Sequence, residues 1–201
     1  MIKYVPKMTS VVLEEIPDRV SLAVDISNCR GNCVGCHSPF LKLDIGEELT
    51  TGIIDALIAD NFGVNCFLFL GEGRDPEALL ALARHIRGAH PAMEIALYSG
   101  REAVEAEIWD AFDYVKVGPY RPECGPLNER TTNQRLYRVH HEESGMPGAG
   151  LRTGNAGIGS PLWGANRPFA RRGEDVAVPG IPVGAEDITF RFWRKGIDPN
   201  R

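Results

Sequence analysis

The sequence predicts an α/β protein whose central sheet is mostly parallel. Short apolar segments with the period of a β-strand alternate with segments of helical spacing, in the order strand, helix, strand, helix, strand, helix, strand. Each of these strands ends in a loop that contains glycine, cysteine or proline, as is usual where a strand turns into a crossover helix. We expect every crossover to be right-handed.

The amino-terminal part of this pattern, residues 11–27, predicts two strands joined by a polar turn around Pro17. In the second strand, large apolar side chains alternate with small or polar ones. The apolar positions are Val20, Leu22, Val24 and Ile26. This period of two predicts a strand with one strongly buried face, which ends directly before Cys29.

The helices that follow begin and end at recognisable signals. The first has apolar residues at helical spacing after Thr50 and closes at Asn61 and Gly63. The second begins with Asp75 as its cap and Pro76 at the first helical position. The third is predicted over 102–112, and the remaining strands over 64–70, 93–98 and 114–117, the first of them buried on both faces.

Four loops follow the carboxyl ends of the predicted parallel strands. They include residues 28–44, 71–73, 98–100 and 118–120. The carboxyl ends of parallel strands lie at the same edge of a sheet, where proteins of this class bind their ligands. We therefore expect these loops to meet and to form the functional site.

The composition is that of a folded domain with a sizeable core, because 43% of the 201 residues are apolar and 24% are charged. The net charge of −5 disfavours non-specific binding to nucleic acid. The longest apolar runs are much shorter than a bilayer span, and the N-terminus lacks the apolar segment of a secretory signal. We therefore expect a cytoplasmic protein without a membrane partner.

Composition divides the chain into three parts. Residues 1–143 hold the periodic segments described above and are expected to form the core domain. Residues 144–184 contain ten glycines and five prolines with few periodic apolar positions, which predicts a flexible insert. Residues 185–201 are expected to pack back on the core through a short strand within 186–195, where Ile188, Phe190 and Phe192 alternate.

Three of the five cysteines, Cys29, Cys33 and Cys36, lie within eight residues. An odd number of cysteines cannot all pair within one chain, and a reducing cytosol disfavours disulfides. A structural zinc site usually takes four ligands, often from two separated cysteine pairs, and the sequence has no second pair. Three thiolates on one loop can instead bind three irons of a [4Fe–4S] cluster and leave the fourth iron open. Zinc and plain structural thiols stay open as alternatives.

The spacing Cys29-x3-Cys33-x2-Cys36, after the first strand of a βα series, resembles the radical S-adenosylmethionine superfamily. Many members carry an aromatic residue at the position of Gly35. A glycine there resembles the activating proteins of class III anaerobic ribonucleotide reductase. Further similar strings are GNCVGCHSPFL (31–41), DIGEEL (44–49), YSG (98–100), VGPY (117–120) and PLNERTTNQRLY (126–137). The resemblance covers about residues 10–140 and 186–195, and the insert has no recognised counterpart.

The resemblance implies a small, partial (βα) radical-SAM barrel with one [4Fe–4S] cluster and S-adenosyl-L-methionine as cofactors. It implies an oxidoreductase that reductively cleaves S-adenosylmethionine and generates the glycyl radical on its partner, anaerobic ribonucleoside-triphosphate reductase. A low-potential donor such as flavodoxin or ferredoxin would supply the electron. An activase of another glycyl-radical enzyme, a radical enzyme for a small molecule, and a non-enzymatic iron or zinc module stay open as alternatives.

The same resemblance implies which residues form the site. Cys29, Cys33 and Cys36 would bind the cluster and act in catalysis through it. The residues that would contact S-adenosylmethionine are Gly35, Cys36, His37, Gly71, Glu72 and Gly73. The last three would receive the methionine amino group, because glycine permits close backbone approach and a carboxylate accepts from an ammonium. The alternatives are a tight strand-to-helix turn for 71–73 and a loop position without a catalytic task for His37.

Other polar and sulfur-containing residues receive simpler interpretations. Arg121, Arg130, Arg135 and Arg138 form a basic stretch that, with Tyr120 and Tyr137, either receives the reductase or is a solvated face. His85, His90, His140 and His141 lack a spacing that pairs them with carboxylates and are interpreted as surface residues. Cys66 lies in an apolar strand and is expected to be an inert buried thiol, whereas Cys124 lies in a loop.

Overall fold

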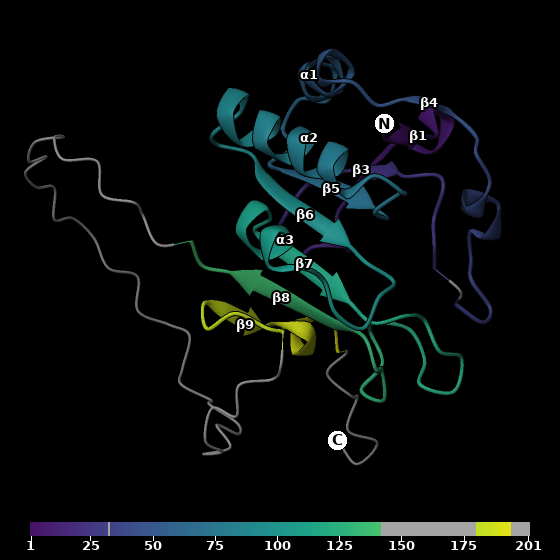
Figure 1. Ribbon diagram of the computed structural model, residues 1–201. Coiled ribbons are helices and arrows are strands. Elements are labelled where there is room, and N and C mark those ends of the chain that lie inside the picture. Colours follow the sequence, from purple (N-terminus) through teal and green to yellow (C-terminus); the bar gives the residue numbers. More distant parts are fainter. Residues whose placement is uncertain (32, 142–179, 194–201) are drawn as a thin grey trace, which may run out of the picture.

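The computed structural model describes residues 1–31, 33–141 and 180–193. In these residues, seven strands form one sheet in the order β2-β3-β5-β6-β7-β8-β9 (Figure 1). The strands in its middle run parallel to one another and are β3 (Ser21–Asp25), β5 (Cys66–Leu70), β6 (Glu94–Tyr98) and β7 (Tyr114–Val117). The predicted α/β class with a mostly parallel central sheet is confirmed.

Antiparallel strands complete the sheet on both sides. β2 (Ser10–Val12) pairs with β3, and β8 (Arg135–Val139) pairs with both β7 and β9 (Ala185–Asp187). A separate two-stranded ribbon joins β1 (Lys3–Tyr4) to β4 (Glu47–Glu48), and a 3-10 helix, η1 (Pro6–Met8), follows β1. The sequence analysis did not predict β8, because two arginines fall within its five residues.

The strand predicted within 186–195 is wrong in its extent. β9 ends at Asp187, and a 3-10 helix, η3 (Thr189–Phe192), follows it. Oδ1 of Asp187 accepts hydrogen bonds from the backbone N–H of Thr189 at 2.9 Å and from its hydroxyl at 2.5 Å. Such a local side-chain bond competes with strand pairing and turns the chain. Ile188 is buried as a result, whereas Phe190 is exposed.

Three α-helices connect the parallel strands, namely α1 (Thr51–Asp60), α2 (Pro76–Ala89) and α3 (Ala106–Ala111). The cap predicted at Asp75 is confirmed, since its Oδ1 accepts the backbone N–H of Ala78 at 3.0 Å. Thr50 caps α1 in the same way through Ile53, at 3.3 Å. α3 is shorter than predicted because the backbone of Glu105 is extended, with φ −68° and ψ 157°.

All three helices lie on one face of the sheet, where their buried residues join one apolar cluster with Leu22, Val24 and Phe69. A smaller cluster covers the opposite face and contains no residue of these helices. Its members are Ile16, Ala23, Cys66, Leu68, Ala96, Tyr114, Leu136 and Ile188. β3 is therefore buried on both faces, and the expectation of one strongly buried face is wrong, because Ile16 and its neighbours cover the side that carries Ala23.

Two of the predicted parts lie largely outside the described residues. These are 142–179, which contain most of the predicted insert, and 194–201 of the C-terminal segment. Of the C-terminal segment, β9 is described, and its Asp187 pairs with Tyr137 of β8. Within the described ranges, no helix combines the length and the apolar character needed to cross a membrane.

Candidate functional site

The loops that follow β3, β5, β6 and β7 meet at one edge of the sheet (Figure 1). Sγ of Cys33 lies 3.7 Å from the position that a Cβ would take on Gly100. A Cβ on Gly35 would likewise lie 3.5 Å from Cε1 of Tyr120. Cys29, the 71–73 turn and Gly100 also line one cavity of about 120 Å³. The expected meeting of the loops is confirmed.

The cysteine loop, residues 28–44, is closed at its base by backbone hydrogen bonds. The N–H of Cys29 donates to the carbonyl of Leu41 at 2.9 Å, and that of Asn28 to the carbonyl of Leu43 at 3.2 Å. A 3-10 helix, η2 (Pro39–Lys42), returns the chain to the end of β3. Asn28 itself takes the left-handed conformation, with φ +61°, which turns the chain as it leaves the strand.

The three cysteines of this loop are free, half-buried thiols. The N–H of Gly31 donates to Sγ of Cys29 at 3.2 Å, and a Cβ on Gly31 would lie 3.9 Å from Sγ of Cys33. In the part of the chain that the structure describes, the three sulfur atoms do not all lie within 4.8 Å of one another. Of the three thiols, that of Cys29 belongs to a residue lining the glycine-rich cavity, and that of Cys33 lies beside Gly100.

The turn after β5 needs glycine for conformational reasons. Gly71 and Gly73 have φ of +114° and +65°, and the N–H of Gly71 donates to the carbonyl of Tyr98 at 3.1 Å. A Cβ on Gly71 would lie 3.3 Å from the carbonyl oxygen of Ile26. The turn alone thus accounts for both glycines. Their position beside the cysteine cavity is also compatible with close approach of a ligand.

Arg101 is a residue of this site that the sequence analysis missed, and it holds Glu72. Its guanidinium lies 2.7 Å from Oε2 of Glu72 and binds both carboxylate oxygens of Glu105, at 2.7 and 2.6 Å. These hydrogen bonds lower the pKa of Glu105 to about 2. Arg101, Glu72 and Glu105 all line the cysteine cavity. A ligand ammonium would therefore meet a carboxylate that already has one cationic partner.

Lys116 is a second missed residue, buried at the carboxyl end of β7. Strand pairing places Asp25, Leu70, Tyr98 and Lys116 in one row across the four parallel strands. Nζ of Lys116 donates to the carbonyl of Gly118 at 2.8 Å and lies 5.9 Å from the centre of the Tyr98 ring. Burial lowers the pKa of Lys116 to about 8, while the nearby charge of Cys33 acts in the opposite direction. In the sequence, burial of this lysine was indicated only by its position between Val115 and Val117 in a predicted strand.

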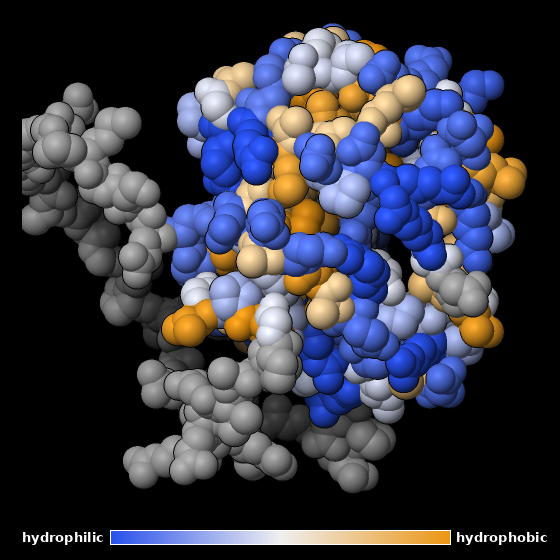
Figure 2. All heavy atoms as spheres, viewed as in Figure 1, coloured by the Kyte–Doolittle hydropathy of each residue, from blue (hydrophilic) through white to orange (hydrophobic). Residues whose placement is uncertain are grey.

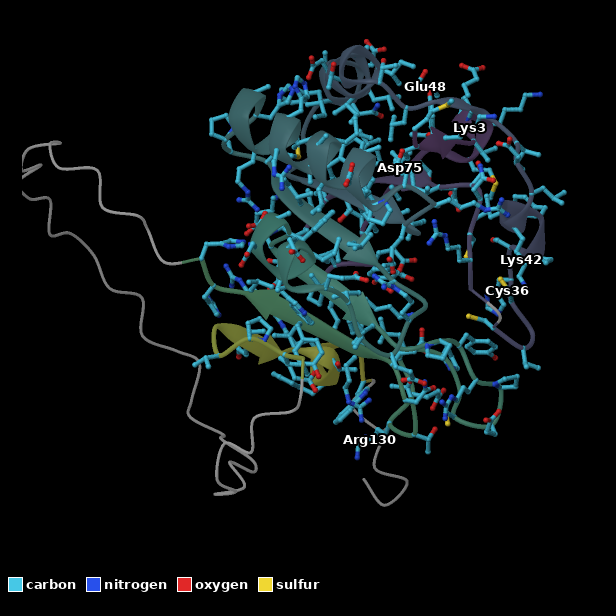
Figure 3. The ribbon with its side chains drawn as sticks, in the orientation of Figure 1. Lys3, Cys36, Lys42, Glu48, Asp75 and Arg130 are labelled. Carbon is cyan, nitrogen blue, oxygen red and sulfur yellow. The ribbon has the colours of Figure 1, made fainter. Side chains whose placement is uncertain are left out.

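The outer side of the cysteine loop carries exposed apolar side chains, those of Val34, Phe40 and Leu43. Figure 2 shows apolar side chains at the right-hand edge of the molecule, where this loop lies, and Figure 3 labels Cys36 on it. His37 is exposed, and its ring lies 5.4 Å from that of Tyr120. His37 thus contacts the loop after β7 and does not line the cavity.

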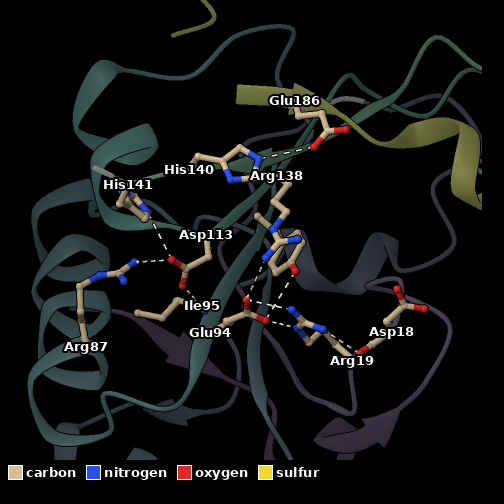
Figure 4. Close-up of polar contacts among 11 residues, drawn as sticks. Asp18, Arg19, Arg87, Glu94, Ile95, Asp113, Arg138, His140, His141 and Glu186 are labelled. Carbon is tan, nitrogen blue, oxygen red and sulfur yellow. Dashed lines mark hydrogen bonds and ion pairs between the residues drawn. The ribbon is translucent and has the colours of Figure 1, made fainter. Parts of the chain in front are cut away.

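The predicted basic stretch does not form one surface. Arg121 pairs with Glu102 at 2.6 Å, Arg135 with Asp187 at 3.6 Å, and Arg138 lies 3.9 Å from Glu94 (Figure 4). Arg130 is exposed and lies well apart from Cys36 (Figure 3). Tyr137 is buried with its ring 5.5 Å from that of Trp109, because successive side chains of β8 point to opposite faces of the sheet. Grouping Tyr137 with an exposed basic surface is therefore wrong.

The four histidines were expected to be surface residues, which is confirmed for His140 and His141, whereas His85 and His90 are half-buried. The absence of carboxylate partners, inferred from their spacing, is wrong. Nε2 of His140 lies 3.4 Å from Glu186, and Nε2 of His141 lies 3.2 Å from Asp113 (Figure 4). His85 and His90 both contact one carboxylate, that of Asp55. The partners come from other elements of the fold, so no local spacing could reveal them. Cys66, by contrast, is buried as expected, and its burial raises the pKa of the thiol to about 12.

Of the predicted site residues, the structure brings Cys29, Gly71, Glu72 and Gly73 around one cavity, with Cys33 against Gly100 beside it. Gly35 and His37 lie instead against Tyr120. Comparison of the chain with protein-family models, curated proteins and solved structures found no match in any of the three. The assignment of this site therefore depends on its residues and their geometry.

Proposed function

We propose that this protein is a radical S-adenosylmethionine activase that generates the glycyl radical on anaerobic ribonucleoside-triphosphate reductase. The observation that carries the proposal is the position of Cys29, Cys33 and Cys36 on one loop at the carboxyl edge of a parallel sheet, where Cys29 lines a glycine-rich cavity and Cys33 lies against Gly100. The strings at 31–41 and 126–137, which resemble the activating proteins, support the choice of partner. Helices on one face of the sheet support a partial (βα) barrel, because a barrel carries its helices on the outside.

In this proposal, the three cysteines hold a [4Fe–4S] cluster as thiolates. When bound, such a cluster supplies one low-potential electron to the sulfonium of S-adenosylmethionine. The buried ammonium of Lys116 lies close enough to Cys33 for the two charges to interact. Glu72, held by Arg101, offers a carboxylate to the amino group of the methionine, and the glycines of the 71–73 turn let the backbone approach it.

A polypeptide substrate fits the surroundings of the cavity better than a small molecule. The cavity lies at the edge of the sheet, and the adjacent cysteine loop presents the exposed side chains of Val34, Phe40 and Leu43. Exposed apolar side chains grouped on one loop are typical of a protein-binding surface. This grouping supports the activase over a radical enzyme that encloses a small substrate.

Anaerobic reconstitution with iron and sulfide tests the proposal. We expect about four irons per chain and dithionite-dependent release of 5′-deoxyadenosine from S-adenosylmethionine. Cys33→Ala should abolish both, whereas Cys124→Ser should retain them, because the hydrogen bonds described at Cys124 use its backbone N–H and carbonyl and not its thiol. A colourless, iron-poor preparation, or full turnover by Cys33→Ala, would refute the proposal.

A second measurement identifies the partner. Electron paramagnetic resonance should show a glycyl radical when the reduced activase and S-adenosylmethionine are mixed with the reductase, and none when the reductase is omitted. Release of 5′-deoxyadenosine without that signal would reject the reductase as substrate and favour another glycyl-radical enzyme or a small molecule. Tight zinc binding that Cys33→Ala abolishes, without any cleavage, would instead identify the cysteine loop as part of a metal-binding module.

A further inference from the structure

Asp55, His85 and His90 form a cluster of side chains that the proposed function does not use. Asp55 lies on α1, and the two histidines lie at the end of the adjacent helix α2 (Figure 1). Oδ1 of Asp55 is 2.8 Å from Nε2 of His85 and 2.7 Å from Nε2 of His90. The three atoms all fall within 4.8 Å of one another. Three potential ligand atoms thus converge on one place.

The end of α2 brings the two imidazoles together. Side chains five positions apart in a continuous helix point about 140° away from each other around the axis. α2 ends at Ala89, however, and His90 leaves the helix with φ −128° and ψ 65°. The centres of the two histidine rings are then 6.4 Å apart, and both rings reach Asp55. Because the helix ends before His90, the two histidines come together although their spacing in the sequence does not predict it.

The chemistry of this cluster suits a metal ion. Two imidazole nitrogens and one carboxylate oxygen are a common donor set for divalent transition-metal ions. Carboxylates are ionised near neutral pH, as a metal ligand must be. The side chains are partly exposed, 28% for His85, 26% for His90 and 43% for Asp55, which leaves room for entry of an ion and for water ligands.

We propose that Asp55, His85 and His90 bind one divalent transition-metal ion. Each histidine would use Nε2 in its neutral form, Asp55 would use Oδ1, and water would complete the coordination. Oδ1 of Asp55 would move about half an ångström away from each Nε2 to reach the spacing of about 3.3 Å between ligands of a tetrahedral ion.

This site is separate from the cysteine loop. α2 begins at Pro76, which lines the cysteine cavity, and its 14 residues span about 20 Å before His90. Removal of the thiols therefore leaves the three proposed ligands in place. Failure of the proposed function would likewise not affect this inference.

The test uses the full chain with Cys29, Cys33 and Cys36 changed to serine, so that thiolates do not compete for the metal. Equilibrium dialysis against Zn²⁺ should give one zinc per chain. Asp55→Asn and His85→Asn, each in that background, should weaken zinc binding at least tenfold. The matched control is His140→Asn, which removes a histidine that pairs with a single carboxylate, Glu186 at 3.4 Å, and should leave the affinity unchanged.

A measurement without substitution at the ligands guards against variants that do not fold. In the same background, the imidazole resonances of His85 and His90 should shift on addition of one equivalent of Zn²⁺, while that of His140 should not. Absence of stoichiometric zinc binding, equal affinity in both folded ligand variants, or a shift confined to other histidines would overturn the proposal.

Discussion

Lys116 gives the folded protein a pH dependence that can be measured through its stability. The residue is 7% exposed, and its burial lowers its pKa from 10.5 to about 8. Below pH 8 the lysine carries its proton in both the folded and the unfolded state, and the folded state bears the full cost of the buried charge. Between pH 8 and 10.5 only the unfolded state keeps the proton, so the free energy of unfolding rises with pH. Above pH 10.5 both states are neutral and the cost is absent.

The expected size of this effect follows from the two pKa values. One pKa unit corresponds to about 1.4 kcal/mol, so the difference between 10.5 and about 8 corresponds to about 3 kcal/mol. The free energy of unfolding of the metal-free parent, minus that of Lys116→Met, should therefore increase by about 3 kcal/mol from pH 8 to pH 10.5. Tyrosines that lie far from Lys116 and titrate in the same range are present in both proteins and cancel in this difference.

Urea denaturation at a series of pH values, with a reductant and a chelator present, measures this difference. The control is Lys7→Met, which removes an exposed lysine and should give a curve parallel to that of the parent. If the curves of the parent and Lys116→Met ran parallel across the range, the buried position of Lys116 beside Tyr98 would be wrong.

Three further predictions concern stability and can be checked by urea denaturation. Phe69→Ala should cost about 3–5 kcal/mol because its ring is fully buried, whereas Phe62→Ala should cost little because Phe62 is fully exposed; equal losses would contradict the assigned core. Gly71→Ala should destabilise the protein more than Gly63→Ala. Both glycines have positive φ, but only a Cβ on Gly71 would approach a backbone oxygen, at 3.3 Å. Equal losses of stability would rule out that contact. Asp75→Ala should cost about 1 kcal/mol and Asp75→Asn much less, since asparagine also caps; similar losses in both would show that the cap is not the cause.

The parallel core of the fold was largely predictable from the sequence, because its signals are local. β7 spans the predicted residues, and the cap at Asp75 lies where the sequence placed it. A strand period or a cap depends on residues within a few positions of one another, so it is visible along the chain. The same is true of the cysteine spacing, which lies in one of the loops that meet at the carboxyl edge of the parallel strands.

The errors occur where a distant segment alters a local preference. β8 forms although it holds two arginines, because β7 on one side and β9 on the other offer backbone partners. β3 is buried on both faces because Ile16, from the segment before it, covers the second face. Neither effect leaves a mark in the period of the strand concerned.

The polar partners of the candidate sites were the least predictable part. Arg101 meets Glu72 across two neighbouring loops, and Lys116 reaches the level of Cys33 because of the register between parallel strands. Asp55 contacts two histidines only because α1 packs against the C-terminal end of α2. Backbone periodicity is dictated by neighbours in the chain, which the sequence displays directly. Which charged groups face one another depends instead on strand register and helix packing, and these arise only when the whole core is assembled.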